Sequence, residues 1–357
     1  MPVRSSTPFF GRAYSLTISP KEKDSKRPTI VVTSDEFEPS ALRITFDVAQ
    51  YAFSAMWQAE IVIWNADGEI TDGPSKGMNL YQAIIREGDM VKLCAAYQAD
   101  YPPDKLPVIW EGPIFYTIQD RPEVTDRRLR IQCLIDRAMT TNNFINETIN
   151  PLTTQFDQAR FIAEKSLNKI SIDARQVQTV LDNRRENSKL PRAKTYFGNP
   201  HNYLTQIADM NSFLSWFDGK KWNLDDAKAP IGKLVATYAP VTPAGGMPVR
   251  MGGITQTLIG QPQQTQLGVT FKVLLDPAVQ VMAPLNQVRI PPQYVRQAPI
   301  AYPLPEGQGP PVPLVDNYVV VGVRFVGDTR GNAWYSEITG LANVLSAVQL
   351  LGELQAH

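Results

Sequence analysis

Histidine and cysteine, the side chains that most often perform hydrolysis or bind zinc, are scarce and scattered in this sequence. The 357 residues include two histidines, His201 and His357, and two cysteines, Cys94 and Cys133. Hydrolytic triads and zinc sites need several such side chains close together. We therefore expect no catalytic, cofactor-binding or metal-binding residues and no cofactor. His201 is expected in an exposed turn, and both cysteines are expected inside strands without a disulfide.

Carboxylates offer a second kind of chemistry, because two of them can hydrolyse a glycosidic bond without histidine. The first half of the chain has four candidates, Glu60, Glu87, Asp89 and Glu111. Glu87 and Asp89 flank a turn glycine, and Glu60 alternates with apolar neighbours, so we interpret these side chains as solvated surface charges. The Asp-Gly pairs nearby lack the ligand spacing of a calcium loop, and the sequence has no glycine-rich phosphate loop.

Composition and charge exclude several classes of protein. The 35 basic and 35 acidic residues cancel, so net charge favours neither nucleic acid nor an anionic membrane, although a local charged patch is compatible with that total. Hydrophobic residues make up 43% of the chain, enough for the cores of two or three domains. Residues Met1 to Arg12 lack the pattern of a signal peptide, and no apolar stretch has the length of a membrane span. We expect a protein assembled in a cytoplasm without membrane insertion.

The pattern of residues 8 to 137 predicts strands throughout and allows one short helix. Leu42, Ile44, Phe46 and Val48 alternate with polar residues, which is the period of a strand with one buried face. Similar runs occur at Tyr14 to Ile18, Thr29 to Thr33, Ala59 to Trp64, Val91 to Tyr97 and Ile114 to Gln119. Such strands must pack or close to cover their edges, so this region is expected to form a barrel or a sandwich.

The period changes to that of a helix near residue 150. Thr154 and Asp157 form a capping pair, and Asn199 with Pro200 supplies an N-cap and a proline at the first helical position. Phe213 to Phe217 and Lys220 to Leu224 predict a hairpin with an Asp-Gly turn. This region is expected to be a small α+β domain.

Three later segments have distinct compositions. Pro240 to Gly253 is predicted to be a linker, and the proline-rich stretch from Pro284 to Pro313 must run over a surface. Its apolar residues can pack on a partner subunit or on the chain itself, and the sequence leaves both open. The spacing from Leu341 to Leu351 predicts a C-terminal helix with little charge, buried on its own domain or on another chain.

A weak internal repeat links the two β regions. Val91, Tyr116 and Leu129 match Val288, Tyr318 and Trp334, at spacings of 197, 202 and 205 residues. Drifting spacings are typical of two related domains whose loops differ in length.

One set of segments carries a family resemblance. They are Gly260-Gln261-Pro262, Thr265-Gln266-Leu267-Gly268-Val269, Leu274-Leu275-Asp276-Pro277, Val288-Arg289-Ile290, the run from Tyr318 through Gly327-Asp328-Thr329-Arg330-Gly331 to Trp334, the region Pro200 to Leu224 and the opening Phe10-Gly11-Arg12. In this order they resemble the baseplate hub and late-control tail proteins of contractile-tailed bacteriophages. Pro284-Leu285-Asn286 departs from the pattern, because a turn glycine is expected before Val288.

The resemblance implies a mainly β fold of two tube-like β-barrels with a small inserted α/β domain. The expected domains are a first barrel at 1–140, an α+β domain at 141–240, a second barrel at 241–340 with a proline-rich loop at 284–313, and a C-terminal helix at 341–357. It further implies a homotrimer in the virion baseplate that joins a hexameric tail tube to a trimeric central spike. The implied partners are spike, tube, tape-measure and wedge or other hub-associated proteins, with DNA only in transit.

Six similar modules in a trimer explain how threefold symmetry can meet sixfold symmetry. Two other functions stay open at this point. A tail-associated enzyme that degrades cell wall would place paired carboxylates in a cleft of the middle domain. A β-barrel module that binds glycan or single-stranded nucleic acid would expose an aromatic platform with basic neighbours.

Overall fold

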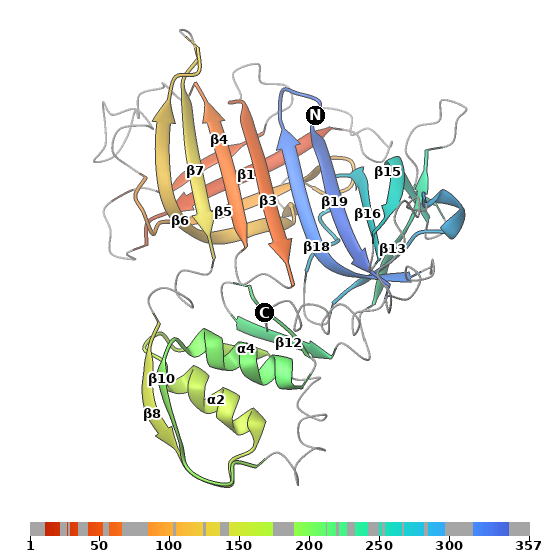
Figure 1. The fold of residues 1–357 in the computed structure, drawn as a ribbon. Coiled ribbons are helices and arrows are strands. Elements are labelled where there is room, and N and C mark those ends of the chain that lie inside the picture. Colours follow the sequence, from red (N-terminus) through yellow and green to blue (C-terminus); the bar gives the residue numbers. More distant parts are fainter. Residues whose placement is uncertain are drawn as a thin grey trace.

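The structure is a computed structural model that describes a defined part of the chain. The described residues are 11–21, 27, 29–34, 42–52, 57–65, 85–102, 105–123, 126–135, 143–173, 189–211, 213–218, 221–226, 233–241, 250–251, 254–265, 268–281, 285–296 and 317–342. Figure 1 shows a large body of strands above a smaller body with two helices. The mainly β fold class predicted from the sequence is confirmed.

The large body consists of two modules, each with the strands of one β region. Module 1 contains β1 (Arg12–Ser19), β2 (Ile30–Thr33), β3 (Ile44–Tyr51), β4 (Gln58–Trp64), β5 (Met90–Tyr97), β6 (Val108–Asp120) and β7 (Arg128–Leu134). Module 2 contains β13 (Leu234–Pro240), β14 (Arg250–Met251), β15 (Ile254–Gln264), β16 (Gly268–Leu274), β17 (Gln287–Arg289), β18 (Asn317–Asp328) and β19 (Trp334–Leu341).

All these strands belong to one sheet, which runs through both modules. Its order is β17-β13-β15-β16-β19-β18-β3-β4-β7-β6-β5-β1-β2, with β14 beside β15. In module 2, the pairing of β17 with β18 closes six strands into a barrel. Module 1 folds over at β6, whose first half pairs with β5 and second half with β7. Figure 1 shows β1 and β5 crossing behind β3, β4 and β7, so that module 1 has two layers.

The two modules share the same strand order. Reading β3-β4-β7-β6-β5-β1 in module 1 against β15-β16-β19-β18-β17-β13 in module 2 pairs the strands in chain order. The four ladders from β3 to β5 are antiparallel in both modules. The first strand differs, because β1 runs antiparallel to β5 whereas β13 runs parallel to β17. The internal repeat predicted from the sequence is therefore present as a repeated topology.

The register of the repeat differs from the one read in the sequence. The amide of Ile114 donates to the Asp89 carbonyl, and the amide of Val320 donates to the Asn286 carbonyl in the same way. A β-bulge follows both residues, between Ile114 and Tyr116 in β6 and between Val320 and Gly322 in β18. Tyr116 therefore matches Gly322 instead of Tyr318. The match read in the sequence was therefore wrong by four residues at this point. A shift by an even number of residues keeps the same side chains on the same face of the strand, so the alternation of buried and exposed residues could not reveal it.

Two glycines let the modules approach closely where β3 pairs with β18. Gly327 lies opposite Phe46, and a Cβ atom at Gly327 would lie 2.2 Å from the Phe46 ring. Gly322 lies opposite Tyr51, and a Cβ atom there would lie 2.5 Å from the Tyr51 ring. Phe46 is buried, whereas Tyr51 is 38% exposed. Only the Tyr51 ring therefore has open space into which it can move.

We expect Gly327→Ala to lower the free energy of unfolding by about 1–3 kcal/mol, because the buried Phe46 ring must shift within a packed core. Gly322→Ala is expected to cost less, because the Tyr51 ring can turn toward solvent. Urea denaturation of both variants measures the difference. Adding Phe46→Leu to Gly327→Ala should recover part of the loss, and equal losses at the two glycines would contradict this account of the junction.

The smaller body is an α+β unit, as the sequence predicted for its helices and hairpin. Its elements are β8 (Ile145–Ile149), α2 (Gln155–Lys165), β9 (Ser171–Asp173), β10 (Lys194–Gly198), α4 (Pro200–Met210), β11 (Phe213–Phe217) and β12 (Lys221–Asp226). The Thr154 hydroxyl accepts from the Asp157 amide, and the Asn199 side chain accepts from the His201 amide. The predicted caps at both helix starts are confirmed.

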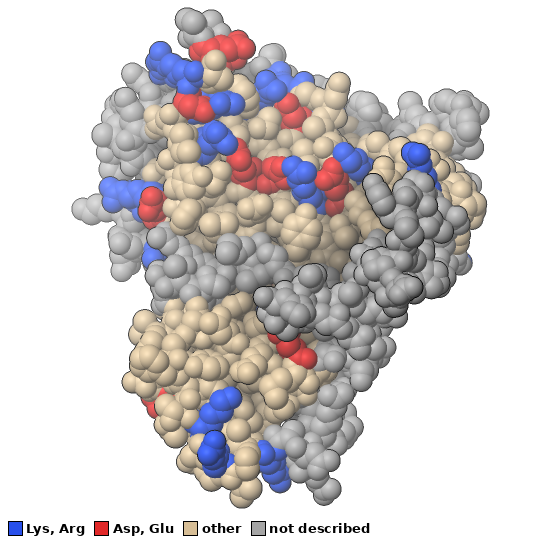
Figure 2. Space-filling model, viewed as in Figure 1, with Lys and Arg blue, Asp and Glu red and all other residues tan. Residues whose placement is uncertain are grey.

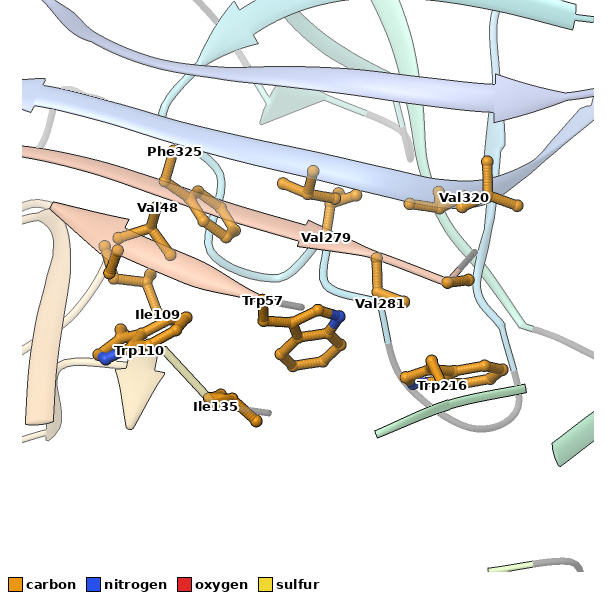
Figure 3. Packing of buried hydrophobic residues seen from close by; sticks show 14 of the residues in the cluster. Val48, Trp57, Ile109, Trp110, Ile135, Trp216, Val279, Val281, Val320 and Phe325 are labelled. Atoms are coloured by element: carbon orange, nitrogen blue, oxygen red, sulfur yellow. The ribbon is translucent and has the colours of Figure 1, made fainter. Parts of the chain in front are cut away.

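The core joins the two bodies. Trp216 of β11 is 2% exposed and belongs to the same apolar cluster as Val281 and Trp57 of the large body. Figure 3 shows the Trp216 ring on the side of this cluster below Val281. The β11–β12 hairpin therefore packs against the large body through Trp216. Within the smaller body, α4 also contacts β11.

Several predictions concern segments that lie wholly or mostly outside the described residues. These are the turn at Gly219, most of the proline-rich loop 284–313 and the C-terminal helix 341–357. Within the predicted linker from Pro240 to Gly253, the described part includes β14. The four-domain division stays a prediction, although β13 lies in the sheet of module 2 before residue 241. Neither described helix is long and apolar enough to cross a membrane.

Candidate functional site

A row of paired charges crosses the exposed face of the continuous sheet, and Figure 2 shows it as a band of red and blue side chains. We call this row the charged belt. It consists of Asp120 on β6, Arg128 and Arg130 on β7, Glu60 on β4, Asp47 on β3, Arg324 on β18, Glu337 on β19 and Lys272 on β16. The belt thus spans seven neighbouring strands and both modules. Its four acidic and four basic side chains give no net charge.

Every cation of the belt is bound to a carboxylate on a neighbouring strand. Guanidinium nitrogens lie 2.6 Å from a carboxylate oxygen in the Arg128–Asp120 pair and 2.7 Å in the Arg130–Glu60 pair. The Lys272 ammonium lies 2.7 Å from Glu337. These are cross-strand pairs, so strand order and register place them.

Arg324 connects the two modules at the centre of the belt. Its guanidinium donates two hydrogen bonds to Asp47 across the β3–β18 ladder and a third, of 3.3 Å, to Glu337. The hydrogen bonds that Arg324 donates to Asp47 raise the pKa of Arg324, and the bond that Lys272 donates to Glu337 raises the pKa of Lys272. Arg324 and Lys272 therefore both stay charged, and the carboxylates of Asp47 and Glu337 neutralise them.

The same face is hollowed beside Arg324. The hollow encloses about 300 Å³, and small side chains at Ala49 and Ala59 form part of its lining. Asp47 and Glu60, which are direct cross-strand neighbours, also line it. Each is salt-bridged and more than a third exposed, whereas the general acid of a glycosidase needs an apolar, buried setting. The hollow lies on the sheet, outside the middle domain in which the enzymatic alternative placed its site.

The structure separates the carboxylates that the sequence singled out. Glu60 is in the belt, and Glu87 and Glu111 are exposed. Asp89 was expected to be solvated, and this was wrong. Its side chain is 3% exposed, and the Arg27 guanidinium contacts it at 2.6 Å. The turn before β5 folds inward here, so that Asp89 also accepts from the backbone amides of Lys21 and Arg86.

The histidine and cysteine candidates are not brought together. Cys94 and Cys133 are buried free thiols, and burial raises the pKa of Cys133 to about 12. His201 was expected to be exposed, but it is half-buried at the start of α4, and this burial lowers its pKa. Within the described ranges, no cluster of three or more His, Cys, Asp or Glu side chains could hold a metal ion.

The tryptophans do not form a platform for bases or sugars. Five of the six are buried, namely Trp57, Trp110, Trp216, Trp222 and Trp334. Trp64 is half-buried, with the Arg43 and Arg128 guanidinium carbons 4.6 and 5.4 Å from its ring centroid. Both arginines are bound to aspartates, so this stack offers no unpaired cation to a phosphate.

The sequence did not predict the belt. Asp47 and Arg324 are 277 residues apart, and Glu60 and Arg130 are 70 apart. The available signal was one or two charges at outward positions of each of these strands. Only strand order and register bring those charged positions next to one another.

The repeated modules and the continuous sheet can be compared with known proteins. No protein-family model matches the sequence, and no curated protein matches it significantly. Among solved structures, the 43 kDa tail protein of prophage MuSo2 from Shewanella oneidensis is similar with a TM-score of 0.51 and 10% identity. The similarity covers 94% of this chain and 99% of that chain.

The chain has the fold of a prophage tail protein. A tail protein from Neisseria meningitidis MC58 is similar with a TM-score of 0.49 and 10% identity, over 94% of this chain and 98% of that one. At such identities, the likeness concerns the fold. The predicted resemblance to phage tail proteins is confirmed at that level.

Proposed function

We propose that this protein is a structural baseplate hub protein of a phage tail and that it is not an enzyme. In this proposal, three copies form a ring that joins a hexameric tail tube to a trimeric central spike. The ring lines a channel for tape-measure protein and DNA. Wedge or other hub-associated proteins would bind its outer surface, and the assembled hub would reside in the virion.

The repeated register is the observation that carries the proposal. Both modules have the same strand order, and both have a bulge at the equivalent positions of β6 and β18. Two equivalent modules in each of three chains make six, which is the number needed to meet a sixfold tube ring.

The continuous sheet supports the same proposal. The eight strands β15-β16-β19-β18-β3-β4-β7-β6 run side by side through one chain without a break. A seven-residue ladder between β3 and β18 holds the modules edge to edge. Three such sheets placed around an axis would form a continuous wall, and edge strands are the parts of sheets that pair most readily with neighbours.

The mass and symmetry of the purified protein test the ring. We expect a particle of three times the 39.8 kDa chain mass in native mass spectrometry, alone or after addition of spike protein. Electron microscopy of that particle should show a ring with six similar lobes around a channel. A chain that stays monomeric with spike and tube proteins, or a ring of another symmetry, would overturn the proposal.

A further inference from the structure

The cations of the charged belt would by themselves form a surface suited to phosphate groups. Arg128, Arg130, Arg324 and Lys272 lie in one row across the sheet, on strands from β7 to β16. Neighbouring strands lie about 4.8 Å apart, so such a row extends over roughly the width of a nucleic-acid duplex. Four unpaired cations in this arrangement would bind phosphates.

In the belt, however, each cation is neutralised by an ion pair with a carboxylate. Asp120, Glu60, Asp47 and Glu337 each contact a cation on the next strand. On the described part of this sheet face, Asp328 at the end of β18 and Arg43 before β3 form a further ion pair. The ion pairs described on this face therefore sum to zero net charge.

Stability alone does not account for this arrangement. The belt side chains are partly exposed, from 23% for Glu337 to 48% for Lys272. Exposed ion pairs typically contribute about 0–1 kcal/mol, because water and salt screen them. Uncharged polar residues would keep the face soluble at similar stability. The paired charges are therefore better explained by a molecule that moves along this sheet face.

We propose that double-stranded DNA passes over the charged belt and that the four belt carboxylates prevent the four belt cations from holding its phosphates. This inference rests on the proposed function, because it takes the belt to face the channel. Cations without their carboxylates would retain the DNA, whereas a wholly acidic row would repel it. A neutral paired row does neither, so the duplex can slide.

A set of matched variants tests the inference. The belt variant carries Asp47→Asn, Glu60→Gln and Glu337→Gln, which leaves Arg130, Arg324 and Lys272 without these partners and keeps the Arg128–Asp120 pair. The control variant carries Glu87→Gln, Glu147→Gln and Glu164→Gln, three exposed carboxylates outside the sheet face, one of which binds Arg160. Both variants change net charge equally. A rescue variant adds Arg130→Gln and Arg324→Gln to the belt variant.

Binding of a short fluorescent DNA duplex is measured by anisotropy over a range of salt concentrations. At about 50 mM salt, we expect the belt variant to bind at least about tenfold more tightly than wild type and control, and the rescue variant to lose this gain. Three new phosphate contacts correspond to a slope of about −2.7 in log K against log salt. Equal binding by belt and control variants, no gain in the belt variant, or tight binding by wild type would overturn the inference.

The oligomeric state of each sample is measured in parallel by light scattering. A wild type that stays monomeric with spike and tube proteins would overturn the ring, but the DNA comparison would still decide the belt, because each single chain carries the complete belt. Circular dichroism of the belt variant should match wild type, since the replaced pairs lie on an exposed face. The two proposals therefore fail through different measurements.

Discussion

Replacing Arg27 by methionine is expected to lower the free energy of unfolding by about 3–5 kcal/mol, because it leaves the buried Asp89 carboxylate without its countercharge. Arg27 donates to both Asp89 oxygens, at 2.6 and 2.8 Å, and the Asp89 side chain is 3% exposed. Two backbone amides alone would then have to stabilise a buried charge. Urea denaturation at neutral pH measures the loss.

The same pair makes stability depend on pH. Burial acts to raise the pKa of Asp89, but the bonds from Arg27 and from the Arg86 and Lys21 amides outweigh it, so the pKa lies below its usual 3.8. The stabilisation is therefore present above about pH 4 and is lost as pH falls through the lowered pKa. We expect the stability gap between wild type and Arg27→Met to narrow in that acidic range.

Arg160→Met is the matched control for this experiment. Arg160 also binds a carboxylate, that of Glu164 at 2.8 Å, but both side chains are more than half exposed. Its replacement is expected to leave stability nearly unchanged at every pH. If the two arginine variants lost equal stability, burial of Asp89 would not be the cause.

Trp216→Ala is expected to cost about 3–5 kcal/mol in the unit that contains the hairpin, because it leaves a large cavity where the smaller body meets the β body. The Trp216 ring is almost fully buried in the shared apolar cluster (Figure 3). Denaturation followed by fluorescence of the other tryptophans measures the loss. Limited proteolysis should also cut the smaller body of this variant sooner than that of wild type.

Trp64→Ala is the control for ring size. Trp64 is half-buried at the end of β4 and lies between two arginines at the surface, so its loss removes fewer buried contacts. We expect a clearly smaller loss of stability and unchanged proteolysis of the smaller body. If Trp216→Ala were as mild as Trp64→Ala, the cluster would not hold the two bodies together.

Much of the local structure could be predicted from the sequence. Alternation located β1, β3, β4 and β5, and the Thr154 and Asn199 caps located the starts of both helices. These signals are local, because pleat, helical period and capping act within a few residues of the chain. The burial of Asp89 was missed because its partner Arg27 lies 62 residues away in the chain, beyond the reach of local patterns.

The sequence alone determined that the protein is mainly β, that it has few residues suited to catalysis and that one β region echoes the other. The tertiary structure decided the register of that echo, the closure of module 2 and the junction between β3 and β18. Alternation has a period of two, so it cannot detect a slip of two or four residues. The charged belt was decided at the same level, because its ion pairs form between neighbouring strands that are far apart in the chain and become adjacent only through folding.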